Sequence, residues 1–401
     1  MKRKFLAKAI TLGLMLAVPF GVEAAYVNTE VNDQTITKWG EQTVIQGGIT
    51  NGTRVDNTTN KTACQIVQNG GIANDTVLIE KDSWYGGRQN VVDGGTANRT
   101  IIGSMARADI RNGSANDFTN NGGELIILQG NVKGTTLNSG TITIHAKTLS
   151  GSGAGTGSYS GATVSNTIIN GGTMKIEKSK NAQLNTNATV TGTVMNDGII
   201  SIDDSTSKLE NTTANGGSIE VYNGTLNNTE LKQSSKMKVY EGSSTINGLK
   251  LYDTSVVNAA SGTFTNVELN NKTSMSLNGA NTAASNVSVT GDAPDRHSSI
   301  YTQNGASIDG LILNSYGLSS TYEGGTVTNV TIKNNAWQGV QGGNATNVTI
   351  EAGGRQTIYD NYKSSNITVQ AGGELVVNKG AVAENVTTDG TIYMRDTGKL
   401  S

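Results

Sequence analysis

The chain has 401 residues and a formal net charge of −2, and Gly, Thr and Asn contribute 51, 52 and 45 residues, more than a third of the total. One cysteine excludes a disulfide scaffold, the near-neutral charge argues against a nucleic-acid-binding protein, and the charged fraction of 15% is low for a helical bundle. Plentiful Thr, Val and Ile beside Gly and Asn, with only two prolines, instead predict short strands joined by tight turns.

The amino terminus has the pattern of a secretory signal peptide. Residues 2–4 are basic, residues 5–20 are mostly apolar, and Val22 and Ala24 supply small residues before a cleavage point. Lys8 and the short apolar run argue against the alternative, a transmembrane anchor. We therefore expect removal of residues 1–24, and an exported protein of residues 25–401 without a membrane-spanning segment. Cys64 is then an unpaired thiol, which we expect to be a small buried residue.

One repeat runs along the rest of the chain. A seven-residue motif usually has Asn, Gly or Asp at its fourth place and Thr or Val at its fifth, and it recurs at a dominant step of about 19 residues. Its seventeen copies begin at Ile49, Ile72, Thr96, Ser114, Asn131, Thr163, Thr189, Lys208, Thr225, Thr245, Thr263, Ala283, Ser307, Thr326, Asn344, Lys363 and Val382.

A second motif lies between these copies. It consists of a Gly pair followed by alternating polar and apolar residues, as from Gly353 or Gly372. The alternation puts Leu375 and Val377 on one face of a strand. Each repeat is then strand, loop, strand, loop, and it is too small to bury its apolar face alone. Stacking the repeats closes a core, which predicts an all-β solenoid of about 17–18 rungs.

The Gly pairs are expected at the corners between strands, because Gly adopts positive φ without steric cost and Asn tolerates it. The Asn residues at the fourth motif place would then stack along the axis and share side-chain amide hydrogen bonds. We expect this structural corner ladder to include Asn329, Asn347, Asn366 and Asn385.

Three glutamines are expected inside the solenoid. Alignment on the Gly corners puts Gln42, Gln65 and Gln89 at one inward place, where later rungs have Leu, Met or Ile. A buried amide is costly unless it is hydrogen-bonded. The alignment therefore predicts an inward amide ladder of these three residues at the start of the core.

The sequence pattern of the repeat is similar to that of a known family. Residues 65–78, 89–102 (QNVVDGGTANRTII) and 374–387 carry, in degenerate form, an alternating strand, a Gly corner and an A-x-x-T-x-I-like strand. Over about residues 40–398 the chain resembles the passenger repeats of AIDA-type autotransporter adhesins. This resemblance implies a right-handed parallel β-helix that is secreted or held at the outer surface of a diderm bacterium.

The resemblance also implies a function. It points to adhesion, auto-aggregation or biofilm formation, with receptors or glycans of host or bacterial surfaces, or further copies of the chain, as partners. It admits O-glycosylation of the repeats by a protein O-heptosyltransferase. The chain departs from the family after Asp396, where no membrane barrel follows before Ser401. We expect either a truncated passenger or export by another route.

Parallel β-helices also host polysaccharide-active enzymes and phage tailspikes, so the alternative function is a polysaccharide-active enzyme or a tailspike-like glycan-binding protein. Its best candidate is an inserted loop with two acids, a base and a His, namely Asp292, Asp295, Arg296 and His297. A solvated corner loop is the favoured interpretation of that cluster. The adjacent Asp203 and Asp204 would point to opposite faces of a strand.

The leading hypothesis is a non-enzymatic adhesin. Its outward Thr331, Thr349 and Thr368 would form a ladder of weak contacts without a catalytic residue. The sequence has no Gly-rich phosphate loop, zinc spacing or calcium nonapeptide, so we expect neither a cofactor nor a metal site.

Overall fold

The computed structural model describes residues 25–37, 40–57, 63–80, 86–145, 161–178 and 187–401. The expected signal peptide, residues 1–24, lies outside these ranges. The described residues form forty strands and no helix, and the named strands pair in parallel. None of their segments is a helix that could span a membrane.

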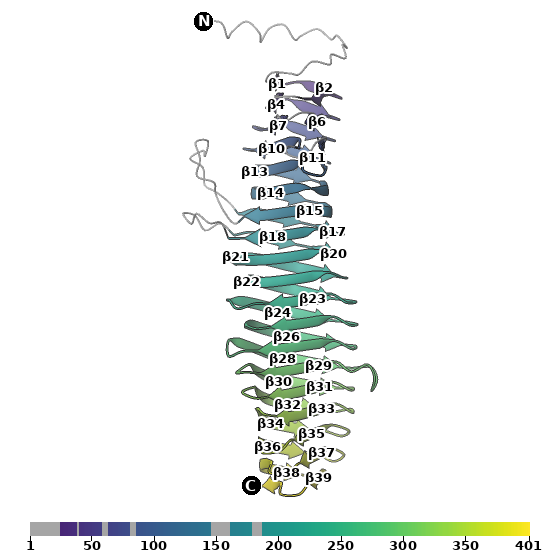
Figure 1. Cartoon of the computed structure of the whole chain (residues 1–401), viewed down its shortest axis with the longest axis vertical. Helices are drawn as coiled ribbons and strands as arrows, with labels where there is room; N and C mark the ends of the chain where they lie inside the picture. The colour runs from purple at the N-terminus through teal and green to yellow at the C-terminus, as the bar shows by residue number, and fades with distance from the viewer. Residues whose placement is uncertain (1–24, 38–39, 58–62, 81–85, 146–160, 179–186) are drawn as a thin grey trace.

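The strands wind into a parallel β-helix of about 18 turns, stacked along one long axis from β1 (Ala25–Val27) to β39 (Thr391–Met394) (Figure 1). The predicted all-β solenoid is confirmed. Each turn has three faces, which we name A, B and C in chain order.

Face A consists of the strands that follow the Gly pairs, and it therefore carries the second motif. Its separate strands are β1, β4 (Glu41–Val44), β7 (Cys64–Val67), β10 (Arg88–Val92), β18 (Thr173–Glu177), β23 (Lys236–Val239), β25 (Val256–Ala259), β27 (Ser274–Asn278), β29 (Ser299–Gln303), β31 (Leu318–Tyr322), β33 (Trp337–Gln341), β35 (Arg355–Ile358), β37 (Glu374–Val377) and β39.

Faces B and C carry the seven-residue motif. Face B alone is formed by β2 (Glu30–Asn32), β5 (Ile49–Asn51), β8 (Ile72–Asn74), β11 (Thr96–Asn98), β16 (Ala162–Ser165), β19 (Thr189–Thr191) and β40 (Lys399–Leu400). Face C alone is formed by β3 (Thr35–Ile36), β6 (Arg54–Asn57), β9 (Val77–Glu80), β12 (Ile101–Ile102), β17 (Ile168–Ile169) and β20 (Val194–Met195).

The remaining strands continue around corners. Faces B and C are joined in β24 (Ser244–Leu251), β26 (Gly262–Asn270), β28 (Thr282–Thr290), β30 (Ser307–Asn314), β32 (Thr326–Ile332), β34 (Asn344–Ile350), β36 (Lys363–Val369) and β38 (Val382–Thr388). Other combinations of faces are joined in β13 (Arg107–Asn116), β14 (Thr119–Lys133), β15 (Thr136–His145), β21 (Ile199–Ala214) and β22 (Ser218–Leu231).

The register of the stack follows the sequence repeat. Each of the seventeen predicted motif starts pairs with the next one, from Ile49 with Ile72 to Lys363 with Val382. The structure adds a start at each end, because Glu30 pairs with Ile49 and Val382 with Lys399. The predicted repeat and its alignment are therefore confirmed.

The expected order of strand, loop, strand, loop is wrong in one respect. The fourth motif place is a bend that divides the seven residues into faces B and C, rather than the middle of a flat strand. In β32 this residue is Asn329, with φ of 55°. A left-handed residue turns the chain without a loop, so the rung gains a third face within the same number of residues.

The Gly pairs do lie at corners, and the two positions of a pair require Gly for different reasons. Gly353 has φ of 74°, in the left-handed region that Gly adopts without cost. A Cβ at Gly354 would lie 2.1 Å from the carbonyl oxygen of Ile332 in the preceding rung. The first Gly therefore permits the turn, and the second permits the close approach of two rungs.

The core changes in polarity along the axis. The fifth motif place points inward and is a buried Thr from Thr76 to Thr229 in most rungs, then Leu249, Val267 and further aliphatic residues. Face A supplies two inward side chains per rung, such as Leu375 and Val377.

Cys64 differs from our expectation, because it is half-buried on the outer side of β7, with the Asn90 amide donating to its Sγ at 3.4 Å.

Candidate functional site

The three aligned glutamines of face A lie inside the solenoid at its amino-terminal end. Gln65 Nε2 donates to Gln42 Oε1 at 2.8 Å, and Gln89 Nε2 donates to Gln65 Oε1 at 2.7 Å. Thr76 and Thr100 also donate to this chain of amides, at 3.1 and 3.0 Å. The arrangement satisfies buried polar groups, and it has no opening to a ligand, so its role is structural.

Two further glutamines occupy the same inward place near the other end. Gln338 pairs with Gln356, whose Nε2 donates to Gln338 Oε1 at 2.9 Å, and Ser319 precedes them in the column. Our expectation that later rungs have Leu, Met or Ile there is wrong for these three, and also for Ala108 and Val257 in the same column. The Gly pair Gly353-Gly354 directly precedes Arg355 and Gln356, so alignment on this corner was the available signal.

The corner ladder is continuous over the last rungs. The side-chain Nδ2 of Asn347 donates to Asn329 Oδ1 at 3.1 Å, that of Asn366 to Asn347 at 3.0 Å, and that of Asn385 to Asn366 at 3.0 Å. All four are exposed and have φ between 51° and 55°. The same residue type thus serves the backbone bend and the contact between rungs.

Two other Asn ladders were not predicted. One occupies the third motif place in the first rungs, and the other lies at the corner between faces C and A. Their members are Asn32, Asn51, Asn74, Asn98 and Asn116, and Asn121, Asn138, Asn170, Asn196 and Asn215. The recurrence of Asn directly before the fourth place was a signal for the first ladder.

The candidate enzymatic loop leaves the stack between β28 and β29 and is exposed. Arg296 lies 3.5 Å from Asp292, and His297 Nδ1 lies 3.4 Å from the carbonyl oxygen of Pro294. Asp295 and His297 are exposed at the same loop. The four residues are close together because they lie in one short loop. Their side chains are exposed to solvent and do not surround a cavity.

The other acidic pair is divided by its strand. Asp203 is exposed on β21, whereas Asp204 is buried and accepts hydrogen bonds from Thr206 and Ser207. This opposite orientation is as predicted. Within the described ranges, no three His, Cys, Asp or Glu residues are placed to hold a metal ion.

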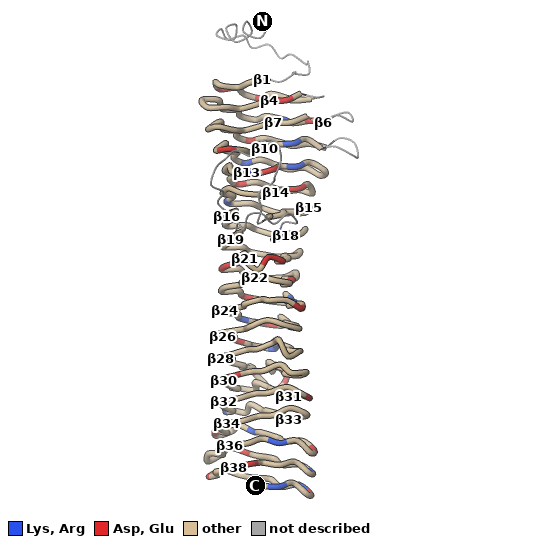
Figure 2. Tube along the Cα trace, turned by 90° about the vertical axis from the view of Figure 1, so that its left-hand side faces the viewer, with Lys and Arg blue, Asp and Glu red and all other residues tan. Residues whose placement is uncertain are grey.

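Acidic and basic residues are interspersed along the stack (Figure 2). Some form ion pairs between neighbouring rungs, as Lys250 and Glu268 do at 3.2 Å. The hydrogen bond to Glu268 raises the pKa of Lys250 above its ordinary value. Exposed pairs of this kind add little to stability, so they keep the surface polar rather than build a site.

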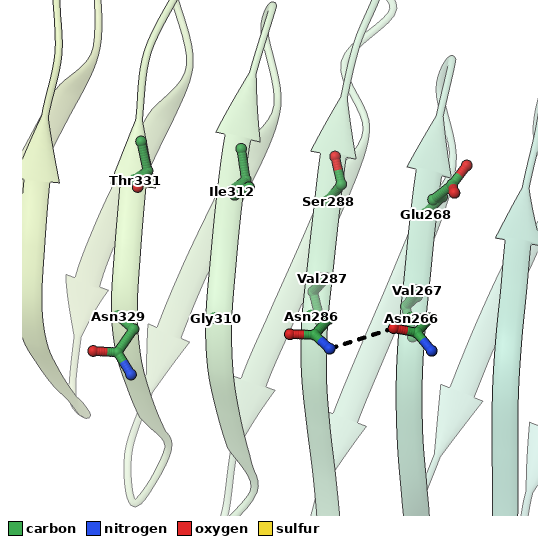
Figure 3. Close-up of a pocket in the computed structure, with 10 residues that line it drawn as sticks. All are labelled: Asn266, Val267, Glu268, Asn286, Val287, Ser288, Gly310, Ile312, Asn329 and Thr331. Carbon is green, nitrogen blue, oxygen red and sulfur yellow. Dashed lines mark hydrogen bonds between the residues drawn. The ribbon is translucent and has the colours of Figure 1, made fainter.

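Face C presents one outward residue per rung. Thr331, Thr349 and Thr368 are directly paired in that column and lie at the surface. We call the residues at the fourth motif place, where faces B and C meet, the corner column. The corner column and the outward column of face C border a shallow groove of about 470 Å³ on β26, β28, β30 and β32 (Figure 3). Its lining residues are Asn266, Val267, Glu268, Asn286, Val287, Ser288, Gly310, Ile312, Asn329 and Thr331.

No family model matches the chain, and no curated protein matches it. Among solved structures it is similar to a fragment of TibA whose hyper-glycosylation was catalysed by TibC, with 19% identity, coverage of 94% of each chain and a TM-score of 0.23. At such a TM-score the two chains do not superpose along their length. The fold therefore rests on the strand pairings of this chain itself.

Proposed function

We propose that the protein is a non-enzymatic adhesive passenger of the AIDA autotransporter type. The observation that supports this is the in-register column of Thr331, Thr349 and Thr368 beside the corner Asn ladder. Such a surface repeats one set of weak contacts about every 4.8 Å, and repetition supplies avidity. The proposed partners are receptors or glycans on host or bacterial surfaces, or further copies of the chain in auto-aggregation and biofilm formation.

The proposal is tested by displaying the full chain on beads and measuring bead aggregation and attachment to cells. Joint replacement of Thr331, Thr349 and Thr368 by Asp places three like charges in one column, which repels a close partner. We expect attachment to fall by about 10-fold or more, because lost contacts multiply in an avid interaction. The matched control is Asp at Ser201, Asn258 and Ser276 on the outer side of face A, with attachment retained.

Export is part of the same proposal. We propose that residues 1–24 are removed and that the remaining chain acts at the cell surface, at the outer membrane or outside the cell. Amino-terminal sequencing of the exported protein would test the cleavage point. Expression without residues 1–24 should leave the protein inside the cell, and equal export of that form would contradict the proposal.

Glycosylation is a separate element of the proposal. Outward Thr such as Thr331 and Thr368 present hydroxyls at the surface in regular columns, and a protein O-heptosyltransferase would reach them. Coexpression with such an enzyme, followed by intact-mass measurement, should show additions in multiples of one heptose. A mass that stays at the polypeptide value would remove this element.

The absence of enzymatic activity is also proposed. In its support, Asp292 and Asp295 lie in an exposed loop, where no enclosed site excludes water from a reaction. Incubation of surface polysaccharides with the chain should release no oligosaccharide. Release that disappears in Asp292→Ala and Asp295→Ala would establish the alternative, a polysaccharide-active β-helix.

A further inference from the structure

The corner column lacks a side chain at Gly310, and we call the space beside this residue the slot. Glycine also takes this corner place in other rungs, but there the preceding rung fills the space. A Cβ would lie 2.2 Å from Asp117 Oδ1 at Gly134, 3.0 Å from Asn166 Oδ1 at Gly192 and 2.8 Å from Asn228 Oδ1 at Gly248. At Gly310 the corresponding distance to Asn286 Oδ1 is 3.6 Å, an ordinary contact distance, so a Cβ would fit there without displacing the preceding rung.

The slot interrupts the amide ladder and leaves an acceptor unused. Asn286 Nδ2 donates to Asn266 Oδ1 at 3.3 Å, and its own Oδ1 points toward Gly310 (Figure 3). Asn329, on the far side of the slot, donates instead to Asp309 at 2.6 Å. Among the described residues no side chain donates to Asn286 Oδ1, so one position of the exposed ladder is vacant where it borders the groove.

The rest of the groove combines apolar and polar groups. Ile312 is 45% exposed and follows the slot on the same strand, whereas the next rungs have Thr in that column. Ser288 and Thr331 place hydroxyls on either side of Ile312 (Figure 3). The only ionisable lining residue is Glu268, which disfavours an anionic ligand.

We propose that this slot binds the acetamido group of an N-acetylated amino sugar. The acetamido N–H would donate to Asn286 Oδ1 in place of the missing ladder amide, and its methyl group would contact Ile312. The hydroxyls of the sugar ring would meet Ser288, Thr331 and Glu268 at the rim. A shallow groove with one oriented acceptor and an apolar contact suits a neutral saccharide. The inference rests on the proposed function, because it identifies a glycan class that the adhesive surface would recognise.

The test uses the full exported chain and two neutral trisaccharides, triacetylchitotriose and cellotriose, which differ at the acetamido group. We expect saturation-transfer NMR to place the acetyl methyl against the protein, and calorimetry to give an affinity for cellotriose at least about 10-fold weaker. Equal affinity for the two sugars would overturn the proposal.

Three variants locate the binding. Gly310→Asn fills the slot with the residue that other rungs carry there, and it should abolish binding while thermal stability is kept or raised. Ile312→Ser removes the apolar contact and should weaken binding of triacetylchitotriose by about 10-fold. Gly192→Asn makes the same change six rungs away and should bind as the wild type does. Undiminished binding by Gly310→Asn would place the sugar elsewhere and refute the site.

The same variants separate this site from the proposed function. If Gly310→Asn abolishes self-association and the wild type binds neither sugar, the slot accepts a side-chain amide of another copy, and the amino-sugar proposal is wrong. If the wild type binds neither sugar but the three-Thr variant loses adhesion, the adhesive function stands without this site. If the slot binds the sugar but the three-Thr variant adheres normally, the site stands and the ladder does not carry adhesion.

Discussion

The indole of Trp337 lies over Gly339 on the outer side of face A. A Cβ at Gly339 would come within 2.5 Å of the ring, and the indole Nε1 donates to Thr357 Oγ1 at 3.0 Å on the next rung. Tyr359 packs against the same indole edge to face, with ring centroids 6.4 Å apart. Gly in the middle of a strand is usually unfavourable, and here its absent side chain provides the space in which the aromatic ring packs.

Gly339→Ala should displace the indole. The methyl group occupies the position of the ring, so the hydrogen bond to Thr357 and the contact with Tyr359 are lost together. We expect a loss of about 1–2 kcal/mol in the free energy of unfolding and a shift of the indole N–H signal in NMR. Ser320→Ala, in the same column on β31, is the control, and an unshifted indole signal in Gly339→Ala would contradict this packing.

Gln65→Leu should be strongly destabilising. Gln65 donates to Gln42 and Thr50 and accepts from Gln89 and Thr76 in the buried core. Leucine leaves those partners buried without hydrogen bonds, at about 1–3 kcal/mol for each unsatisfied group. We expect chemical denaturation to show a loss of at least about 3 kcal/mol.

Gln338→Leu is the matched control for that change. Gln338 Nε2 has no hydrogen-bond partner, and its Oε1 accepts only from Gln356. The same substitution therefore removes an unsatisfied amide group as well as one hydrogen bond, and the two effects offset each other. A larger loss in Gln338→Leu than in Gln65→Leu would mean that the amide ladder does not stabilise the amino-terminal rungs.

Thr193→Val should stabilise the protein. Thr193 is fully buried at the fifth motif place, and its Oγ1 has no hydrogen-bond partner. Valine keeps the branched shape and removes the unsatisfied hydroxyl, which is worth about 1 kcal/mol. Thr76→Val provides the contrast, because the Thr76 hydroxyl donates to Gln65. We expect melting temperatures to move in opposite directions, and a shared direction would count against this account of the core.

Cys64 should be unreactive in the folded protein at pH 8.5. Burial, with a smaller contribution from Glu41, raises the pKa of the thiol to about 12, and the thiolate is the nucleophile. An unfolded thiol ionises near pH 8.5, so the stability that favours the neutral thiol is present below that pH and is lost as pH rises toward 12. Iodoacetamide should label Cys64 rapidly only in denaturant, and rapid labelling of the native chain would refute the shift.

Val348→Asp should loosen the stack locally. The substitution puts a carboxylate among apolar side chains, where desolvation opposes its charge. In a solenoid each rung contacts only its neighbours, so hydrogen exchange should rise around Val348 and toward Ser401 while the rungs near Val44 keep their protection. An even loss of protection from Val44 to Val386 would indicate a single cooperative core.

The sequence alone determined the period of this fold and the facing of its side chains. The seventeen motif starts pair in the predicted order, and alternation correctly assigned inward residues such as Val348 and Leu375. Both are local properties, because a strand exposes alternate residues to opposite sides and stacked repeats preserve their alignment. Even the Gln42, Gln65 and Gln89 column followed from alignment on the corners.

The tertiary structure alone decided how neighbouring rungs fill the space around each corner. The motif bends at residues such as Asn329 to make a third face, and Trp337 packs over Gly339. Gly192 and Gly310 occupy the same motif place, yet a neighbouring amide closes only the first. Such outcomes depend on the rotamers and hydrogen bonds of the preceding and following rungs, which lie about 19 residues away in the chain and meet only when the helix is wound.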